Sequence, residues 1–153
     1  MGAPSTWISG RAHAQAGILV PGHPTVGLRF VQGRAPAVGF FDVGQVKRVN
    51  ARACAPVGCF DDTTLIEESS PAAPGDGKQT KFYAPGVGLV KIGAQGGDSR
   101  EVMTLTRVSH LGAAALAQAR AAVLTLEARA YRVSQPYRHT PAMHRCLGEE
   151  CGD

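Results

Sequence analysis

Four residues near the C-terminus carry side chains that bind metal ions. His139, His144, Cys146 and Cys151 follow one another in the pattern H-x4-H-x-C-x4-C. Zinc is held in tetrahedral geometry by four nitrogen or sulfur ligands of these kinds. The spacing matches no established zinc finger, and the surrounding segment has few apolar residues for a core. Three interpretations stay open: a zinc site, a Cys146–Cys151 disulfide, and a tail whose histidines and cysteines are incidental.

The other two cysteines, Cys54 and Cys59, flank a predicted turn at residues 55–58. Facing positions of a β-hairpin come close enough for a disulfide, and such a bond persists in an oxidising compartment. The alternative is that both are small buried apolar residues, a common role for reduced cysteine. The sequence leaves the redox state of this pair open.

No catalytic constellation is visible in the sequence. Adjacent carboxylates occur at Asp61-Asp62 and Glu67-Glu68, but neighbouring residues of a strand point to opposite faces. Neither pair therefore converges on one cleft, and we interpret both as solvated. The G-x-S-x-G nucleophile elbow and the G-x-x-x-x-G-K phosphate loop are both absent from the sequence. We expect no enzymatic activity and no cofactor.

Charge and hydropathy limit the partners. The net charge is +4, and the 16 Lys and Arg residues are scattered, with the densest group at Lys47, Arg48 and Arg52. A nucleic-acid surface needs a basic stripe on one face, so we expect no nucleic-acid partner. No run reaches the roughly 18 apolar residues of a transmembrane helix. Residues 1–10 also lack the basic and apolar regions of a signal peptide.

The elements are organised around a strand, turn and strand at residues 78–92. Tyr83 is a good strand former. Pro85-Gly86 fits the centre of a type II turn, because Pro presets φ and Gly accepts a positive φ. Gly88 permits a bulge or a close backbone approach directly after the turn. This stretch predicts a structural hairpin built on Tyr83, Pro85, Gly86 and Gly88.

The remaining pattern predicts a mainly β (α+β) fold. Short apolar runs separated by Gly- and Pro-rich turns favour an antiparallel β-meander, as a half-barrel or a sandwich-like sheet. One C-terminal helix is expected at residues 113–131, which lack Gly and Pro and carry an apolar stripe at helical spacing. Ser109 is a candidate N-cap, and strands are expected at residues 26–32, 38–53, 59–67 and 100–108.

These elements predict a chain of three segments in one domain. Residues 1–108 form the antiparallel β-rich region, residues 109–134 a helix packed on the sheet, and residues 135–153 a flexible tail. Five or six strands with one helix are too few to close a barrel, so we expect an open sheet edge. We therefore expect missing N-terminal strands or a partner to cover it.

Short blocks of the chain resemble a group of bacterial proteins of unknown function. These blocks are Gly17–Pro21, Pro24–Gly27, Phe82–Lys91 and Ala130–Ser134. The family is typically extracytoplasmic, with predicted lipoproteins and secreted proteins of high-GC bacteria. The likeness spans about residues 7–140 and is strong only in these blocks. The resemblance implies an extracytoplasmic, antiparallel β protein, of which this chain is the C-terminal portion. It carries over no catalytic residue.

Together these observations predict a non-enzymatic extracytoplasmic β-rich module that acts in binding or in envelope structure. Its ligand site is expected between the sheet face and the helix, where apolar concavity forms. The expected partners are the missing N-terminal part of the same protein or an envelope partner. One alternative is a zinc-binding protein or hydrolase that uses the His/Cys tail. Another is a fragment without independent function.

Overall fold

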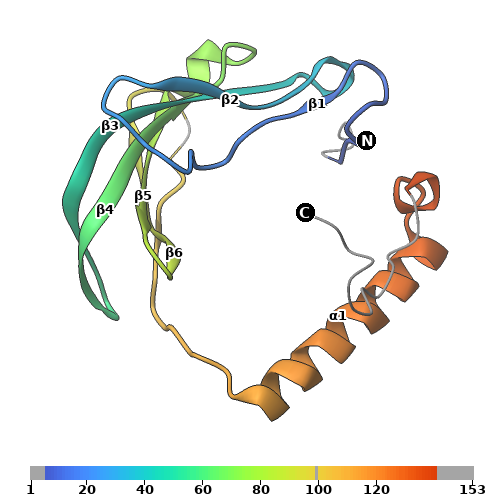
Figure 1. Ribbon diagram of the computed structural model, residues 1–153. Coiled ribbons are helices and arrows are strands. Elements are labelled where there is room, and N and C mark those ends of the chain that lie inside the picture. The colour runs from blue at the N-terminus through green and yellow to red at the C-terminus, as the bar shows by residue number, and fades with distance from the viewer. Residues whose placement is uncertain (1–5, 99, 141–153) are drawn as a thin grey trace. The chain divides into compact units, whose positions relative to one another are not determined.

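The computed structural model describes residues 6–98 and 100–140 (Figure 1). The chain divides into two compact units, a sheet unit up to Ser109 and a helical unit from His110. Within the described residues, seven antiparallel strands form one open sheet in sequence order. The predicted mainly β, antiparallel meander with one C-terminal helix is confirmed. The strands are β1 Gln15–Ala16, β2 Arg29–Ala35, β3 Phe40–Ala55, β4 Gly58–Ser69, β5 Lys78–Ala84, β6 Gly88–Gln95 and β7 Met103–Thr104.

Strands β3 and β4 form a long hairpin that bends strongly (Figure 1). Its register shifts at three places, between Val46 and Arg48, between Arg48 and Ala51, and between Ala51 and Ala53. Each shift is an extra residue on one strand, and such bulges bend a strand and increase its twist. Asn50 and Asp62 lie at two of the shifts with φ of 51° and 60°. Asn and Asp adopt this left-handed conformation more readily than other non-glycine residues.

The core of the sheet unit lies where the long hairpin meets the later strands. Val46, Thr63, Ile66 and Val90 are fully buried. Val46 pairs directly with Ile66 across β3 and β4, so their side chains share one face. The buried hydroxyl of Thr63 donates a hydrogen bond of 2.7 Å to the Ala51 carbonyl. That bond satisfies a polar group next to a bulge, where the regular ladder is interrupted.

Aromatic rings cover two glycines of the sheet. A methyl group added at Gly44 would lie 2.5 Å from the ring of Phe30, its direct partner on β2. A methyl group at Gly33 would lie 2.8 Å from the ring of Phe40, which stacks on Trp7 with centroids 5.6 Å apart. The absence of a side chain at each glycine leaves room for the ring next to the strand. Trp7 is thereby packed on the sheet.

Backbone hydrogen bonds connect the tip of the β3–β4 hairpin to the last part of the sheet. The amide of Leu105 donates to the Val90 carbonyl at 2.9 Å, and the Leu105 carbonyl accepts from Val57 at 3.4 Å. Leu105 therefore joins β6 to the turn between β3 and β4. The buried side chains of Ala53, Ala84 and Val90 form an apolar cluster beside this connection.

The strand expected at residues 100–108 is much shorter than predicted. β7 has only two residues, which pair with Lys91 and Ile92. Beyond it, Leu105 bonds to two different parts of the sheet, so no single ladder continues. The apolar side chains of Val102 and Met103 are 69% and 52% exposed, so burial does not hold this edge in a longer strand.

The helical unit contains α1, Ala113–Val133, and a short 3-10 helix, η3, Tyr137–His139. The N-cap of α1 is Gly112, so the expectation of Ser109 is wrong. The rings of Tyr131 and Tyr137 meet edge to face with centroids 6.0 Å apart. No helix in the described part of the chain is long and apolar enough to cross a membrane. The packing of the helix on the sheet and the three-segment division stay predictions.

The bulge at Asn50 gives a test of this architecture. We expect Asn50→Val to lower the free energy of unfolding by roughly 1–2 kcal/mol, because a β-branched residue is strained at positive φ. Asn50→Gly should leave the free energy unchanged or slightly higher. Urea unfolding followed by circular dichroism measures both. The control is Arg48→Val at an exposed position of β3 outside the residues with positive φ. Equal losses at both positions would contradict the left-handed backbone of Asn50 as the cause.

Candidate functional site

The predicted hairpin residues come together in one turn. The Val87 amide donates to the Ala84 carbonyl at 3.2 Å, and Gly86 has a φ of 69°. With Pro85 before it, this is a type II turn. Gly88 has a φ of 94°. The β5–β6 register shifts next to Tyr83, which pairs with Leu89.

A loop from the N-terminal part of the chain lies against this turn. Hydrogen bonds hold the loop on both sides: Gln32 Nε2 donates to the Leu19 carbonyl at 3.1 Å, and the Gly27 amide donates to the Val46 carbonyl at 2.8 Å. Between loop and turn lies an open pocket of about 500 Å³, which we name the hairpin pocket. It is lined by Val20, Pro21, Gly22, Pro24, Thr64, Tyr83, Ala84, Pro85, Gly86, Val87 and Gly88.

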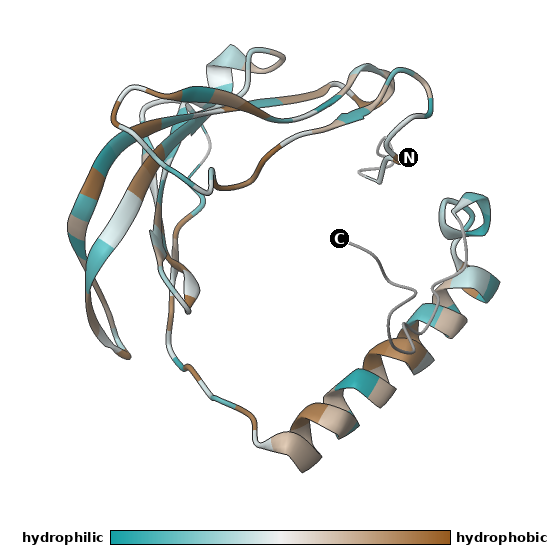
Figure 2. Cartoon of the chain, in the orientation of Figure 1, coloured by the Kyte–Doolittle hydropathy of each residue, from teal (hydrophilic) through white to brown (hydrophobic). Residues whose placement is uncertain are grey.

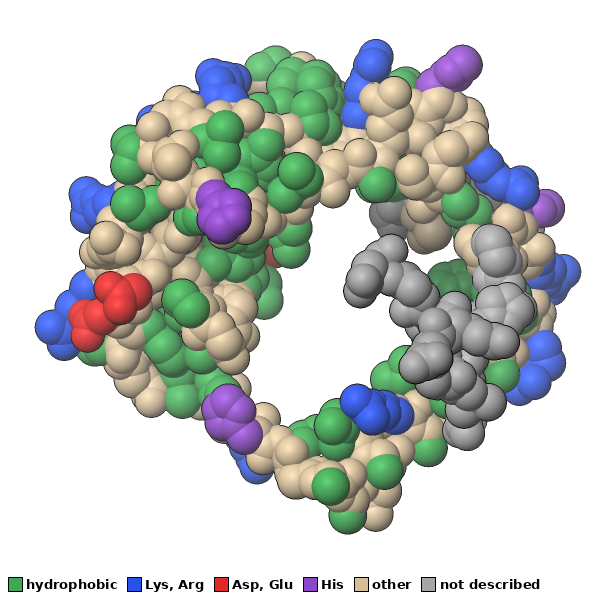
Figure 3. Space-filling model, in the orientation of Figure 1, with side chains coloured by type: hydrophobic (Ala, Val, Ile, Leu, Met, Phe, Trp, Pro, Cys, Tyr) green, Lys and Arg blue, Asp and Glu red, His purple; other side chains and the backbone are tan. Residues whose placement is uncertain are grey.

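The hairpin pocket is largely apolar, with two hydroxyl groups. Thr64 and Tyr83 are direct partners on β4 and β5, so their side chains lie on the same face. Burial, and secondarily the charge of Glu68, raise the pKa of Tyr83 to about 12. The phenol therefore stays protonated at neutral pH and can donate a hydrogen bond. On the face drawn in Figure 3, patches of hydrophobic side chains lie among other residues of the sheet unit.

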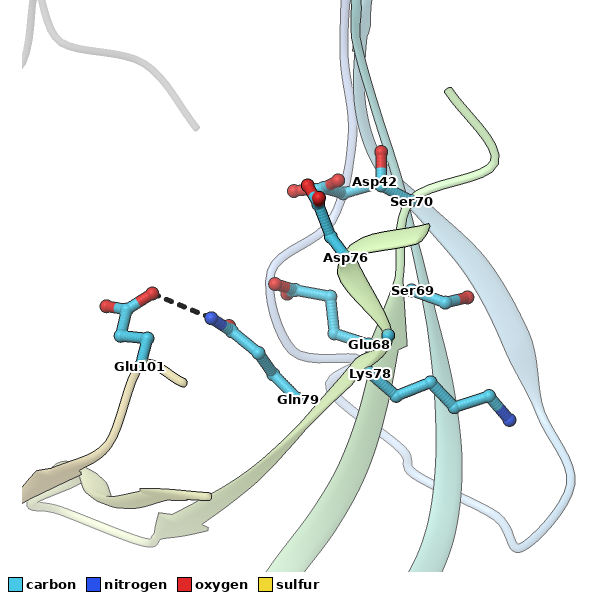
Figure 4. Close-up of a pocket in the computed structure, with 9 residues that line it drawn as sticks. Asp42, Glu68, Ser69, Ser70, Asp76, Lys78, Gln79 and Glu101 are labelled. Atoms are coloured by element: carbon cyan, nitrogen blue, oxygen red, sulfur yellow. Dashed lines mark hydrogen bonds between the residues drawn. The ribbon is translucent and has the colours of Figure 1, made fainter. Parts of the chain in front are cut away.

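A second cavity, of about 260 Å³, lies toward the other end of β4 and β5. We name it the acidic pocket; its side chains come from Asp42, Glu68, Ser69, Ser70, Asp76, Lys78, Gln79 and Glu101. In Figure 4 the carboxyl groups of Asp42, Glu68 and Asp76 lie on one side of the strands, and Lys78 points to the other. Gln79 Nε2 donates to Glu101 Oε2 at 2.7 Å.

The carboxylates of β4 are paired with lysines. The side chains of Glu67 and Glu68 are only 15% and 11% exposed, so their interpretation as solvated is wrong. Lys78 Nζ lies 2.9 Å from Glu67 Oε1, and Lys81 forms an ion pair with Glu68. Diagonal positions on adjacent strands explain these pairs, because each lysine of β5 lies two residues from the residue that faces its glutamate.

Asp42 in the acidic pocket has no such ion pair in the described structure. Burial, and secondarily the charge of Glu68, raise the pKa of the Asp42 carboxyl, while Ser70 and Lys81 act in the opposite direction. No group of three or more His, Cys, Asp or Glu side chains within residues 6–98 and 100–140 is arranged to hold a metal ion. The acidic pocket is a polar end of the sheet, where burial raises the pKa of the Asp42 carboxyl.

Cys54 and Cys59 are joined by a disulfide at the tip of the β3–β4 hairpin. They are direct partners in the ladder, and both are exposed. The alternative of two small buried residues is therefore wrong. The bond lies next to the turn that contacts Leu105 through Val57.

The predicted metal ligands fall mostly beyond the described part of the chain. His139 is an exposed residue of η3. His144, Cys146 and Cys151 lie outside the described residues. A zinc site or a Cys146–Cys151 disulfide stays a prediction.

Sequence reasoning missed the loop at residues 20–24 and Thr64 as parts of one site. The loop and the hairpin are far apart in the sequence, and only the folded sheet brings them together. One signal was present, since both segments combine Pro, Gly and Val in a short stretch. No family model matches this chain, and neither a curated protein nor a solved structure matches it.

Reduction of the Cys54–Cys59 bond should destabilise the sheet unit. The bond closes a loop with a sequence separation of 5. A loop of this size is worth about 2 kcal/mol in the chain-entropy account. We expect dithiothreitol to lower the free energy of unfolding by about that amount. Cys54→Ser/Cys59→Ser should lose the response and Cys146→Ser/Cys151→Ser should keep it. If Cys54→Ser/Cys59→Ser kept the response to dithiothreitol and Cys146→Ser/Cys151→Ser lost it, the Cys54–Cys59 bond would not be its source.

Neutral substitutions of Asp42 and Glu67 should change the free energy of unfolding in opposite directions. The raised pKa of Asp42 means that stability falls as pH rises from the unfolded value through the folded one. Asp42→Asn should therefore raise the free energy of unfolding at pH 7 and have little effect near roughly pH 3. Lys78 lowers the pKa of Glu67 by donating a hydrogen bond to it. Glu67→Gln should accordingly reduce stability at pH 7, and the loss should fade in acid. Urea unfolding of both variants at both pH values tests these two predictions. Changes of equal sign in the free energy of unfolding at pH 7 would contradict them.

Proposed function

We propose that this chain is a non-enzymatic extracytoplasmic binding module whose hairpin pocket takes a small, largely apolar ligand. The observation that carries the proposal is the cavity of about 500 Å³ between the loop and the turn. Small-molecule sites commonly have volumes of about 300–1,000 Å³, with apolar walls and a few polar groups. The hairpin pocket has that size and that composition.

The walls of the pocket favour a preformed site. Pro85 and Gly86 form a hydrogen-bonded type II turn on one side. On the other side, the hydrogen bonds of Leu19 and Gly27 tie the loop to the sheet. A site already held in its binding conformation loses little entropy when a ligand enters. The hydroxyls of Thr64 and Tyr83 would orient a ligand that carries one hydrogen-bonding group.

The chemistry of the pocket favours binding over catalysis. Among its lining residues, Tyr83 is the one with an ionisable side chain. A general acid or base works best with a pKa near the operating pH. The pKa of Tyr83, raised to about 12, is far from neutral pH. The phenol is therefore suited to donating a hydrogen bond rather than to exchanging a proton.

The exposed disulfide supports the extracytoplasmic part of the proposal. Disulfides persist in secreted and envelope proteins and are rare in the reducing cytosol. Cys54 and Cys59 are both exposed, so a soluble reductant would have access to their bond. The resemblance to extracytoplasmic bacterial proteins points to the same location.

Filling the pocket should abolish binding of a neutral apolar probe. A methyl group added at Gly22 or Gly75 would meet no atom within 4 Å, and neither glycine has a positive φ. Both therefore accept a side chain without strain, but only Gly22 lines the hairpin pocket. We expect Gly22→Trp to weaken binding of N-phenyl-1-naphthylamine by at least about tenfold, and Gly75→Trp to bind as the parent chain does. Fluorescence titration measures both.

Two results would count against the proposed function. Equal binding by Gly22→Trp and the parent chain would place the probe elsewhere. Turnover of an ester, phosphate or glycoside by the parent chain, lost in Gly22→Trp and kept in Gly75→Trp, would show that the pocket is catalytic.

A further inference from the structure

Helix α1 carries an apolar stripe with a seven-residue repeat. Positions 116, 123 and 130 alternate with positions 119, 126 and 133 at spacings of three and four. This is the a and d spacing of a helix that pairs with another helix. Hydrophobic bands recur along α1 in Figure 2. The stripe consists of Leu116, Ala119, Val123, Leu126, Ala130 and Val133.

The large side chains of the stripe are exposed to solvent. Leu116, Val123, Leu126 and Val133 are 39%, 54%, 63% and 67% exposed, and α1 has no buried residue. A different side of the helix carries Tyr131, which packs on Tyr137 within the helical unit. A helix of 21 residues gains most of its stability from packing of its apolar face. We therefore expect another surface to pack on the stripe.

The stripe is complementary to itself when the partner helix runs in the opposite direction. A two-fold axis near position 124 brings Leu116 opposite Val133 of a second copy, since a positions face d positions in antiparallel pairs. The same axis brings Ala119 opposite Ala130 and Val123 opposite Leu126. Large residues then meet large ones and small residues meet small ones in every layer. Such matching is the condition for a two-fold symmetric interface.

The flanking charges favour the antiparallel direction. Arg120 and Glu127 lie seven residues apart at equivalent positions beside the stripe. In the antiparallel pair, Arg120 lies beside Glu127 of the second copy, and the symmetry axis produces this ion pair twice. In a parallel pair, Glu127 would lie beside Ala122, which offers no charge.

We propose that α1 is a homodimerisation helix, which pairs antiparallel with α1 of a second copy through this stripe. The paired helices are about 30 Å long, at 1.5 Å per residue. So short an interface, with one of its three kinds of layer built on alanine alone, makes a dimer that dissociates on dilution. The proposal is independent of the hairpin pocket, which shares no residue with the stripe.

Sedimentation velocity of the full chain over a wide range of concentrations tests dimerisation. We expect a concentration-dependent shift from monomer to dimer, lost in Leu126→Lys. The matched control is Ala121→Lys, an exposed position of α1 outside the stripe, which should dimerise as the parent chain does. A monomer at all concentrations would overturn the proposal and would favour the alternative that the stripe packs on the chain's own sheet. A dimer that persists in Leu126→Lys would overturn it as well.

A charge exchange tests the direction of the helices and does not depend on the folding of Leu126→Lys. Arg120→Glu and Glu127→Arg each place like charges together at both symmetric positions, so each should weaken the dimer by roughly tenfold. The double variant Arg120→Glu/Glu127→Arg should restore the parent dissociation constant at low salt. Failure of the double variant to restore dimerisation would overturn the antiparallel arrangement.

Discussion

The curvature of the β3–β4 hairpin is the constraint on which the sheet unit depends. Bulges near Asn50 and Asp62 bend two strands that would otherwise run straight. The bend brings the hairpin tip to Leu105. The backbone of Leu105 is hydrogen-bonded both to Val57 at the tip and to Val90 of β6. Ala84 belongs to the cluster beside this connection, and the turn at Pro85 starts directly after it. The position of the hairpin pocket thus follows from the bend.

Strands β4 and β5 carry two different environments along one pair of strands. Toward the turn, Thr64 and Tyr83 face an apolar cavity. Toward the other end, Glu68 and Lys81 form an ion pair near Asp42, whose pKa is raised. The two ends interact, since the charge of Glu68 contributes to the raised pKa of Tyr83. Negative charge near the phenol stabilises its protonated form and so preserves its hydrogen-bond donor.

Local sequence patterns predicted the elements better than their contacts. Pro85-Gly86 requires one kind of turn whatever surrounds it, and the Ala- and Leu-rich run at 113–131 can form little other than a helix. The bulges were not predicted, because Asn50 also fits an ordinary turn or loop and its left-handed backbone follows from the pairing of β3 with β4. Glu67 and Glu68 were misjudged for a related reason. Their lysine partners lie on the next strand, and the sequence does not show the register.

Binding by the hairpin pocket and pairing of α1 would reinforce each other, although they use different residues. The hairpin pocket belongs to the sheet unit and the stripe to the helical unit, and the two share no residue. A ligand free in solution would gain nothing from the dimer. A ligand displayed on a membrane or polymer would meet two pockets at once, and the second contact would be intramolecular. A weak helix pair would then favour attachment to surfaces over capture of free molecules.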